Sequence, residues 1–215
     1  MLINGGPVSS TWIDANCSAV LESWYGGQEA GTAIAETLFG KNNPAGRLPV
    51  TVYHSTSELP DFANYDMTNR TYRYDPRKPL YLFGFGLSYS KFTYDSWEAP
   101  KKLVIGKDLV GRVRVTNTSK RDGDEVVQLY LSHPVKGSAI RELRWFKRVS
   151  IPAGKSQWID VRIPAKNLSV HDEYGDHILV PEKLTATIGG GQPGTAGLAA
   201  PLNLSFELSG ATKKW

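Results

Sequence analysis

The feature that most constrains the fold is a two-residue alternation of apolar and polar side chains in the second half of the chain. It begins at Leu109, with Val113 and Val115 on one face and Arg112 and Arg114 on the other. Successive side chains of a β-strand point to opposite faces of a sheet, so this spacing predicts a half-buried strand. The same rhythm returns in the apolar positions Val127, Leu129 and Leu131; Ile159, Val161 and Ile163; Leu184, Ala186 and Ile188; and Leu202, Leu204, Phe206 and Leu208.

Turn-forming residues separate these predicted strands. They cluster at 120–124, 152–154 and 189–197, a spacing typical of an antiparallel sandwich of about seven strands. We therefore expect residues 98–215 to form an immunoglobulin-like β-sandwich and the fold class to be mainly β. The glycines at 189–191 lack the Lys-Ser/Thr ending of a phosphate-binding loop and are interpreted as part of a turn.

Residues 1–52 have a different pattern. Leu2 and Ile3, followed by Asn-Gly-Gly-Pro, predict the end of a buried strand and a turn. Helical spacing predicts a short helix over 11–21 and a second over 28–39, which Gly40 is placed to end. One strand and two helices cannot close a core, so we interpret this part as the C-terminal remnant of an α/β sandwich domain. The alternative is that the rest of the chain covers its exposed faces.

Between these parts lies a stretch without helical or strand periodicity. Residues 41–97 hold 12 of the 23 aromatic rings of the chain. Irregular backbone needs its polar groups satisfied and its rings buried, so residues 53–97 are predicted to be an extended, aromatic-rich connecting arm that lies across a packed surface.

Composition excludes several classes of function. A formal charge of +4 over 215 residues is too mild and too evenly spread for a nucleic-acid binder, and no run of about 18 apolar residues exists for a membrane span. One cysteine, Cys17, cannot form a disulfide framework or a multi-cysteine metal site. The four histidines lack metal-ligand spacing and are interpreted as surface or loop residues. We expect no metal, no cofactor, no nucleic-acid partner and no membrane partner.

Several longer motifs occur in a characteristic order. They are INGGPV at 3–8, WYGGQEAGTAIAETLFG at 24–40, NPAGRLPVT at 43–51, NRTYRYDPRKPLYLFGFGLSY at 69–89, GDEVVQLYLSHP at 123–134 and RELRWFKRVSIPAG at 141–154. With these motifs the chain resembles the C-terminal portion of family 3 glycoside hydrolases, the retaining β-glucosidases and β-xylosidases that carry a fibronectin type III-like domain. The resemblance implies a fibronectin III-like sandwich, preceded by the partial α/β unit and the arm.

The resemblance also implies what this chain lacks. Members of the family use an aspartate nucleophile from an N-terminal barrel and a glutamate general acid/base from the α/β domain, and both precede the position that corresponds to Met1. A retaining mechanism needs the two carboxyl groups about 5 Å apart. We therefore expect this chain alone to be inactive. The implied partners are the barrel and the remaining α/β domain of the same enzyme, or a second copy bound through the exposed α/β face. The implied ligand is a β-linked glucan or xylan oligosaccharide, with glucose, xylose and arabinose all open as the sugar.

The arm carries the candidate substrate-binding residues Arg70, Tyr72, Arg73 and Tyr74. Aromatic rings suit the apolar faces of a pyranose, and guanidinium groups suit its hydroxyls. The competing interpretation is that the rings pack the arm between two domains and the arginines pair with nearby carboxylates.

Two other charged residues, and the function of the chain as a whole, allow more than one interpretation. Glu29 is interpreted as a first-turn helix residue rather than a catalytic acid. Arg47 is interpreted as one half of a structural salt bridge rather than a ligand clamp. The alternative function is a noncatalytic carbohydrate-binding or adhesion module that uses exposed rings at Trp97, Trp145 or Trp158, and a third is a structural spacer without a ligand. A periplasmic or secreted location is expected if the full-length protein carries a signal peptide.

Overall fold

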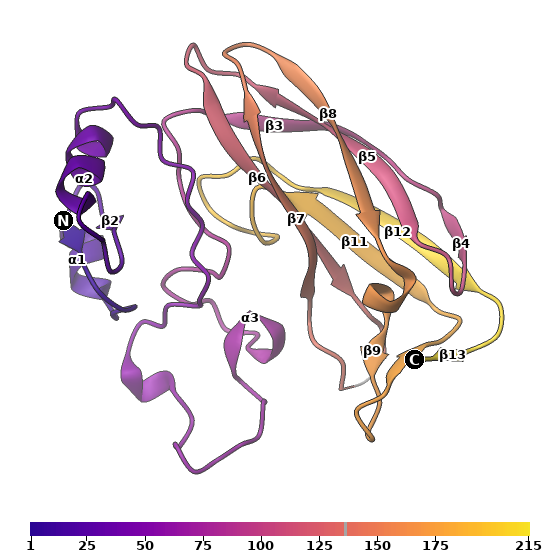
Figure 1. The fold of residues 1–215 in the computed structure, drawn as a ribbon. Helices are drawn as coiled ribbons and strands as arrows, with labels where there is room; N and C mark the ends of the chain where they lie inside the picture. Colours follow the sequence, from indigo (N-terminus) through magenta and orange to yellow (C-terminus); the bar gives the residue numbers. More distant parts are fainter. Residues whose placement is uncertain (136) are drawn as a thin grey trace.

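The computed structural model describes residues 1–135 and 137–215, and the architecture is mainly β, as predicted (Figure 1). A two-layered β-sandwich occupies the C-terminal half of the chain. A smaller helical unit stands beside it, and the arm runs between the two. The sandwich strands are β3 (Phe92–Glu98), β4 (Lys102–Val104), β5 (Leu109–Asn117), β6 (Gly123–Ser132), β7 (Glu142–Ile151), β8 (Ser156–Ile163), β11 (Lys183–Gly189) and β12 (Leu202–Ser209).

Two sheets pack face to face to form the core. One has the strand order β4-β12-β11-β6-β7 and the other β3-β5-β8. The apolar members of each alternation point inward and are at most 2% exposed in β5, β6, β8 and β11, which confirms the predicted period. The pairing is antiparallel except for β4, which runs parallel to β12. This one parallel pair departs from the expected all-antiparallel sandwich.

Three strands of the sandwich, β3, β4 and β7, were not predicted individually. β3 lies in the segment expected to be irregular, yet it pairs with β5 from Phe92↔Asn117 onward. Its alternation is hidden because the register shifts between Tyr94 and Ser96, which interrupts the period of two. β7 pairs with β6 over its whole length, although only its two ends are buried.

The N-terminal unit consists of β1 (Leu2–Ile3), α1 (Thr11–Asn16), β2 (Leu21–Glu22) and α2 (Ala30–Leu38). β1 and β2 form a two-stranded parallel sheet. The helix predicted over 11–21 ends at Asn16, because Cys17 has extended backbone and Leu21 pairs with Leu2 instead. The expected burial of the first strand is also wrong, since Leu2 is 44% exposed and no described element covers it.

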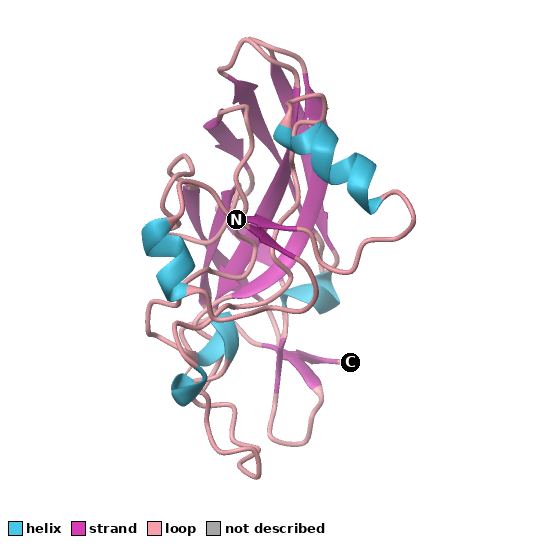
Figure 2. Ribbon diagram, turned by 90° about the vertical axis from the view of Figure 1, so that its left-hand side faces the viewer, coloured by secondary structure: helices cyan, strands magenta, loops and turns pink. Residues whose placement is uncertain are grey.

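The arm contains two short helical turns, η1 (Thr56–Glu58) and α3 (Thr71–Tyr74). Irregular backbone begins directly after α2 and Gly40, so the arm comprises residues 41–97 in the structure. Its early part runs antiparallel to its later part, with Leu48 N–H donating to Phe85 O at 2.8 Å and Val52 paired with Tyr81. Figure 2 shows the N-terminal unit and the arm in front of the strands of the sandwich. The arm therefore contacts the sandwich over part of its length. The predicted burial of its rings holds only in part, because Phe62 and Tyr65 are 97% and 90% exposed.

The arm changes the burial of the central strand β6. Gln128 and Tyr130 occupy the polar positions of its alternation, yet they are only 2% and 1% exposed. Both side chains contact arm residues, so β6 is buried on its outer face as well as its inner face.

The remaining elements lie at the lower end of the sandwich in Figure 1. They are η2 (Ala165–Leu168) and a small sheet of β9 (Val170–His171), β10 (His177–Leu179) and β13 (Lys213–Lys214). In the described part of the chain, no helix has the length and apolar character needed to cross a membrane.

Candidate functional site

The predicted substrate-binding residues lie in and just before α3, where the arm meets the sandwich. Asn69 and Thr71 both have left-handed backbone, with φ of 60° and 57°. Asn adopts this conformation more readily than most residues, whereas it is costly for a β-branched residue such as Thr. The chain therefore bends sharply at this point and turns the following side chains toward the sheet.

Arg70 faces the arm itself. Its guanidinium donates hydrogen bonds to the backbone carbonyls of Asp61, Asn64 and Asp66, with the Nε to Asp66 O distance at 2.8 Å. These carbonyls belong to one loop, so Arg70 holds that loop in a fixed shape. The expected carboxylate partner is replaced here by backbone oxygens.

Tyr72 joins the arm to the sandwich. Its ring stacks on Phe83 with the centroids 4.3 Å apart and meets the edge of Tyr130 at 6.0 Å. Its hydroxyl accepts a hydrogen bond from Leu143 N–H at 3.1 Å. The ring therefore has the packing role that the sequence left open as the alternative to sugar binding.

Arg73 forms an ion pair with the sandwich. It donates to Glu142, which also accepts from Arg144. The guanidinium of Arg73 lies 5.4 Å from the centroid of the Tyr74 ring. Arg73 and Tyr72 thus reach the same edge of β7.

The four residues do not converge on one cavity. Tyr72 lines a cavity of about 170 Å³ between the arm and the sandwich, whereas Arg70 faces the loop that begins at Asp61. Arg73 and Tyr74 contact each other beside Glu142. Their assignment to substrate binding stays a prediction.

A buried ion pair fixes the start of the arm to the sandwich. Arg47 Nη2 donates to both carboxylate oxygens of Glu125 at 3.2 Å, and the two side chains are 6% and 4% exposed. Arg47 Nε also donates to Gly190 O at 3.3 Å. The structural interpretation of Arg47 is therefore correct.

Glu125 has one property of a catalytic acid but not the access. Burial raises the pKa of its carboxyl group above the ordinary value, against the opposing effect of Arg47. Tyr94 donates its hydroxyl to the same carboxylate at 3.1 Å, and burial raises the pKa of this phenol well above its usual range. Both oxygens of Glu125 are occupied in the interior, so it cannot protonate a bound glycoside.

Two glutamines extend this junction along the arm. Gln128 Nε2 donates to Gly84 O at 3.0 Å and to Gly190 O at 2.9 Å, and its Oε1 accepts from Tyr130 at 2.6 Å. Gln192 Nε2 donates to Phe83 O at 2.7 Å. These contacts satisfy arm carbonyls that have no strand partner.

Asn43 makes a third anchor near the β5–β6 turn. Its Nδ2 donates to Ser90 Oγ at 2.9 Å and to Asp122 O at 2.8 Å. Its Oδ1 accepts from Ser88 Oγ at 2.9 Å and from Tyr89 N–H at 3.0 Å. The Asn43 side chain thus joins the start of the arm to residues 88–90 near the end of the arm and to the β5–β6 turn of the sandwich.

Sequence reasoning missed most of these anchors. Glu125 carried a signal, because it shares the inward period of Val127 and Leu129 and a charge at a core position needs a partner. Gln128 carried none, because a polar residue on the outer face of a strand looks the same whether or not another segment covers it. Gln192 lies in the turn between β11 and β12, where a polar residue is expected in any case.

A groove of about 530 Å³ lies on the N-terminal unit, between β2 and α2. It is lined mainly by small and apolar residues that include Leu21, Ala30, Ala33 and Ile34. Glu29 at its rim is exposed and is the N-cap residue of α2, close to its interpreted place in the first turn.

The burial of one histidine and of two tryptophans differs from what the sequence predicted. His133 is buried rather than at the surface, and its Nδ1 lies 2.9 Å from Glu182 Oε1. Within residues 1–135 and 137–215, no group of three or more His, Cys, Asp or Glu side chains is arranged to hold a metal ion.

The three tryptophans suggested for carbohydrate binding differ in exposure. Trp97 and Trp145 pack against the core, whereas Trp158 is 38% exposed with the Arg112 guanidinium 4.6 Å from its ring.

Two family models match the chain. Residues 1–89 match the glycosyl hydrolase family 3 C-terminal domain, and residues 125–192 match the fibronectin type III-like domain. The second match lies in the sandwich and the first covers the N-terminal unit and most of the arm.

Curated relatives agree with these matches. A xylan 1,4-beta-xylosidase of Xylanibacter ruminicola is 38% identical over 73% of this chain and 18% of its own length. A periplasmic beta-glucosidase of Salmonella typhimurium is 32% identical over 88% of this chain and 27% of its own length. The chain thus spans about a quarter or less of the length of these relatives.

Solved structures show the same fold. A β-glucosidase from Erythrobacter marinus superposes with a TM-score of 0.82 at 30% identity, covering 97% of this chain and 28% of its own. A β-glucosidase from Listeria innocua in complex with isofagomine gives 0.83 at 26% identity, covering 97% and 31%. The chain therefore belongs to glycoside hydrolase family 3, of which it carries C-terminal domain sequence followed by a fibronectin type III-like domain.

Proposed function

We propose that this chain acts as the C-terminal part of a retaining β-glycosidase that hydrolyses β-glucosides or β-xylosides. Its contribution is to stabilise the α/β domain and to position the arm at the rim of the active site. The two catalytic carboxylates come from the barrel and the remaining α/β domain of the same enzyme, which are the partners of this chain.

The observation that carries the proposal is the unequal burial of the two halves. The sandwich closes its own core, but the N-terminal unit exposes large apolar side chains. Trp12 is 72%, Leu38 65% and Phe39 86% exposed, and the groove between β2 and α2 is open beside them. Apolar surface of this extent marks an interaction site. The two-stranded parallel sheet supports the same conclusion, because parallel sheets are normally buried on both faces.

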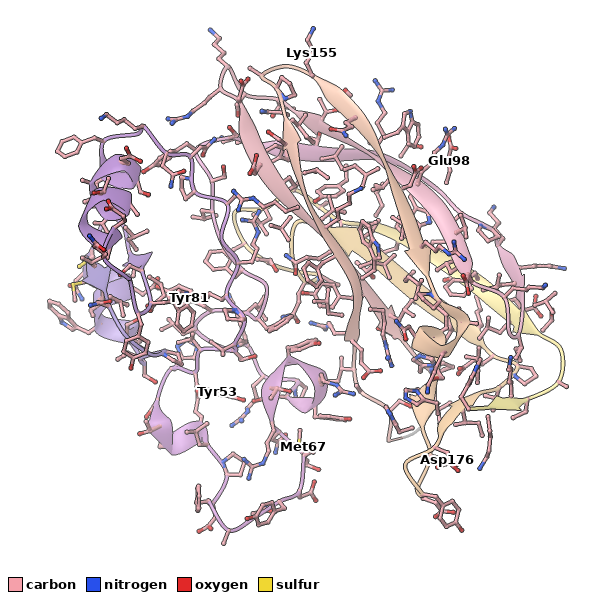
Figure 3. All side chains as sticks on the ribbon, viewed as in Figure 1. Tyr53, Met67, Tyr81, Glu98, Lys155 and Asp176 are labelled. Atoms are coloured by element: carbon pink, nitrogen blue, oxygen red, sulfur yellow. The ribbon has the colours of Figure 1, made fainter. Side chains whose placement is uncertain are left out.

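The junction between arm and sandwich supports a positioning role. Arg47, Gln128 and Asn43 fix the arm at three places with hydrogen bonds, those of Arg47 and Gln128 being buried or largely buried, so the N-terminal unit and the sandwich are held by one continuous interface. Tyr81, labelled in Figure 3, extends it by donating to Asp14 of α1 at 2.7 Å. We propose that this interface orients the arm in the whole enzyme.

Two finer predictions belong to this proposal. The first divides the chain into parts at 1–52, 53–97 and 98–215, with the last strand of the arm, β3, paired into the sandwich. The second gives Arg70, Tyr72, Arg73 and Tyr74 a place in sugar binding at the active-site rim. Self-association through the exposed α/β face is the alternative to the intramolecular partner.

The experiment compares the chain alone with a chimera. In the chimera, residues 1–215 replace the matching C-terminal part of the Erythrobacter marinus β-glucosidase. We expect the chain alone to leave aryl β-glucosides and aryl β-xylosides intact and the chimera to hydrolyse at least one of them. In the chimera, Tyr74→Ala is expected to raise KM if this ring contacts the sugar and to leave KM unchanged if it only supports Arg73.

The remainder of the Erythrobacter enzyme without its C-terminal part is the control and should show no turnover. Hydrolysis by the 215-residue chain alone would contradict the proposal, as would a monodisperse, folded chimera without activity.

The alternative, a carbohydrate-binding or adhesion module, now rests on Trp158. Of the three rings proposed for it, this one faces outward on the sheet of β3, β5 and β8, and the Arg112 guanidinium covers part of its face. One partly covered ring offers less stacking area than a polysaccharide platform needs, so the enzyme proposal is favoured.

A further inference from the structure

The cavity between the arm and the sandwich contains a cation without an anionic partner. Arg141, which precedes β7, is partly buried and lines this cavity together with Tyr72 and Gln192. Its Nη1 donates to Gln192 Oε1 at 3.0 Å. No carboxylate of the described residues lies within ion-pair distance of it, whereas Arg47, Arg73 and Arg144 each have one.

Burial makes this arrangement costly. Desolvation lowers the pKa of Arg141 below the ordinary arginine value, against a smaller opposing effect of the Tyr130 phenol. A partly buried guanidinium stays charged near neutral pH, so its lost hydration has to be replaced by hydrogen-bond acceptors. Gln192 supplies one neutral acceptor, which leaves the other N–H donors of the Arg141 guanidinium available to a molecule in the cavity.

The other charged side chains of the cavity neutralise each other. Arg77 and Asp75 both line it and form an ion pair of 2.7 Å, with the Asp75 side chain only 6% exposed. Arg77 holds the pKa of that carboxyl below its usual value, so Asp75 remains ionised. The described residues that line the cavity therefore carry a net charge of one positive unit, from Arg141. A ligand with one negative charge neutralises this lining. The second charge of a dianion would have no cationic partner and would be repelled by the Asp75 carboxylate.

The rest of the lining is suited to a hydroxylated organic molecule. Thr51 contributes a buried hydroxyl that has no hydrogen-bond partner among the described residues, and Thr71 adds a second hydroxyl residue. Pro79, Leu82 and Ile140 supply apolar surface. The volume of about 170 Å³ is well below the roughly 300 Å³ of a drug-sized pocket. The occupant is accordingly small, no larger than a single sugar ring.

We propose that this cavity binds a small hydroxylated monocarboxylate, with the carboxylate on Arg141 and the hydroxyl groups near Thr51 and Thr71. A sugar acid fits this description in charge, size and mixed polarity. The proposal stands whether or not the enzyme proposal holds, because the residues that line the cavity all belong to the described chain.

Isothermal titration of the 215-residue chain tests the site, with D-glucuronate as the probe near neutral pH. We expect D-glucuronate to bind, D-glucose to bind at least about tenfold more weakly because it lacks the charge, and inorganic phosphate to bind more weakly than D-glucuronate. Arg141→Gln is expected to weaken D-glucuronate binding about tenfold or more. Arg141→Lys keeps the charge but not the fork, so we expect an intermediate affinity.

Arg114→Gln is the matched control, because it removes one exposed arginine charge from β5, on the outer face of the sandwich. It should bind D-glucuronate like the original chain. Thermal unfolding of each variant, followed by circular dichroism, checks that Arg141→Gln is folded.

Equal D-glucuronate affinity in Arg141→Gln and the original chain would overturn the proposal, as would preferential phosphate binding or no heat with D-glucuronate. If Arg141→Gln does not fold, Arg141→Lys decides, since unchanged affinity there would exclude a bidentate contact. A xylo-oligosaccharide with a glucuronate branch separates the two sources of the ligand. Binding of this oligosaccharide would support a glycan branch, and binding of only the free acid would support a soluble metabolite.

Discussion

At the scale of single residues, the junction between the arm and the sandwich depends on buried polar side chains that find hydrogen-bond partners across it. Glu125 is the clearest case, because its two oxygens are shared between Arg47 and Tyr94 in the interior. A buried pair of this kind adds little stability over apolar residues, but the loss of one partner leaves a charge without hydration. The pair therefore specifies where the arm docks more than it strengthens the fold.

Glu125→Gln is expected to lower the free energy of unfolding of the sandwich by about 3 kcal/mol or more, since it leaves the Arg47 charge buried and unpaired. Urea denaturation followed by tryptophan fluorescence measures it. Asp124→Asn is the matched control, because it changes the neighbouring residue and breaks the solvent-exposed pair with Arg148. Its cost should stay below about 1 kcal/mol. If both variants lose the same free energy of unfolding, the buried pair matters no more to stability than the exposed one, which would contradict the prediction.

At the scale of elements, the contact between the arm and β6 is close enough to require glycine. Gly84 has a φ of +79°, and an added Cβ would lie 2.3 Å from Gln128 Oε1 and 2.6 Å from the Tyr130 hydroxyl. The positive φ and the close approach both exclude larger residues. The local backbone of the arm is thus fitted to the outer face of one particular strand.

Gly84→Ala is expected to loosen the arm from β6 and to destabilise the protein by about 1–3 kcal/mol. Limited proteolysis should then cut within residues 53–90 faster than in the original chain. Gly46→Ala provides the comparison, because a Cβ at Gly46 meets no atom within 4 Å and its φ is not positive. The cleavage rate of Gly46→Ala should match that of the original chain, and an unchanged rate in Gly84→Ala would argue against a tight arm contact.

At the scale of the whole molecule, the two halves differ in how completely they bury apolar surface. The sandwich encloses a single core of residues from both sheets. The N-terminal unit instead leaves Leu38 and Phe39 at the end of α2 largely exposed. Such a surface favours association with whatever apolar surface is available.

We expect the isolated chain to self-associate in a concentration-dependent way, and the double variant Leu38→Ser with Phe39→Ser to reduce that association. Size-exclusion chromatography with light scattering gives the mass of each form. Phe146→Ser is the control, because it removes a ring that is 66% exposed but lies on β7 of the sandwich. Association that responds to Phe146→Ser and not to the pair on α2 would place the interface on the sandwich.

The sequence by itself determined the elements whose signal is local. Strands β5, β6, β8, β11 and β12 followed from the period of two, because the direction of successive side chains depends only on neighbouring residues. The motifs at 3–8, 24–40, 43–51 and 69–89 indicated the family, and the aromatic content of the arm indicated a packed surface. Arg47 was correctly interpreted as structural, although its partner was not identified.

Only the tertiary structure decided which polar side chains would be covered. Arg47 meets Gly190 across 143 residues of sequence, and Gln128 meets Gly84 across 44. No local pattern encodes such a contact, since an outward Gln on a strand has the same neighbours in sequence whether water or the arm lies over it. For the same reason, nothing in the sequence distinguishes Arg141 from an exposed arginine, and only the fold places it in a cavity beside the arm. Side-chain direction is a property of the backbone, whereas burial is a property of the assembled fold.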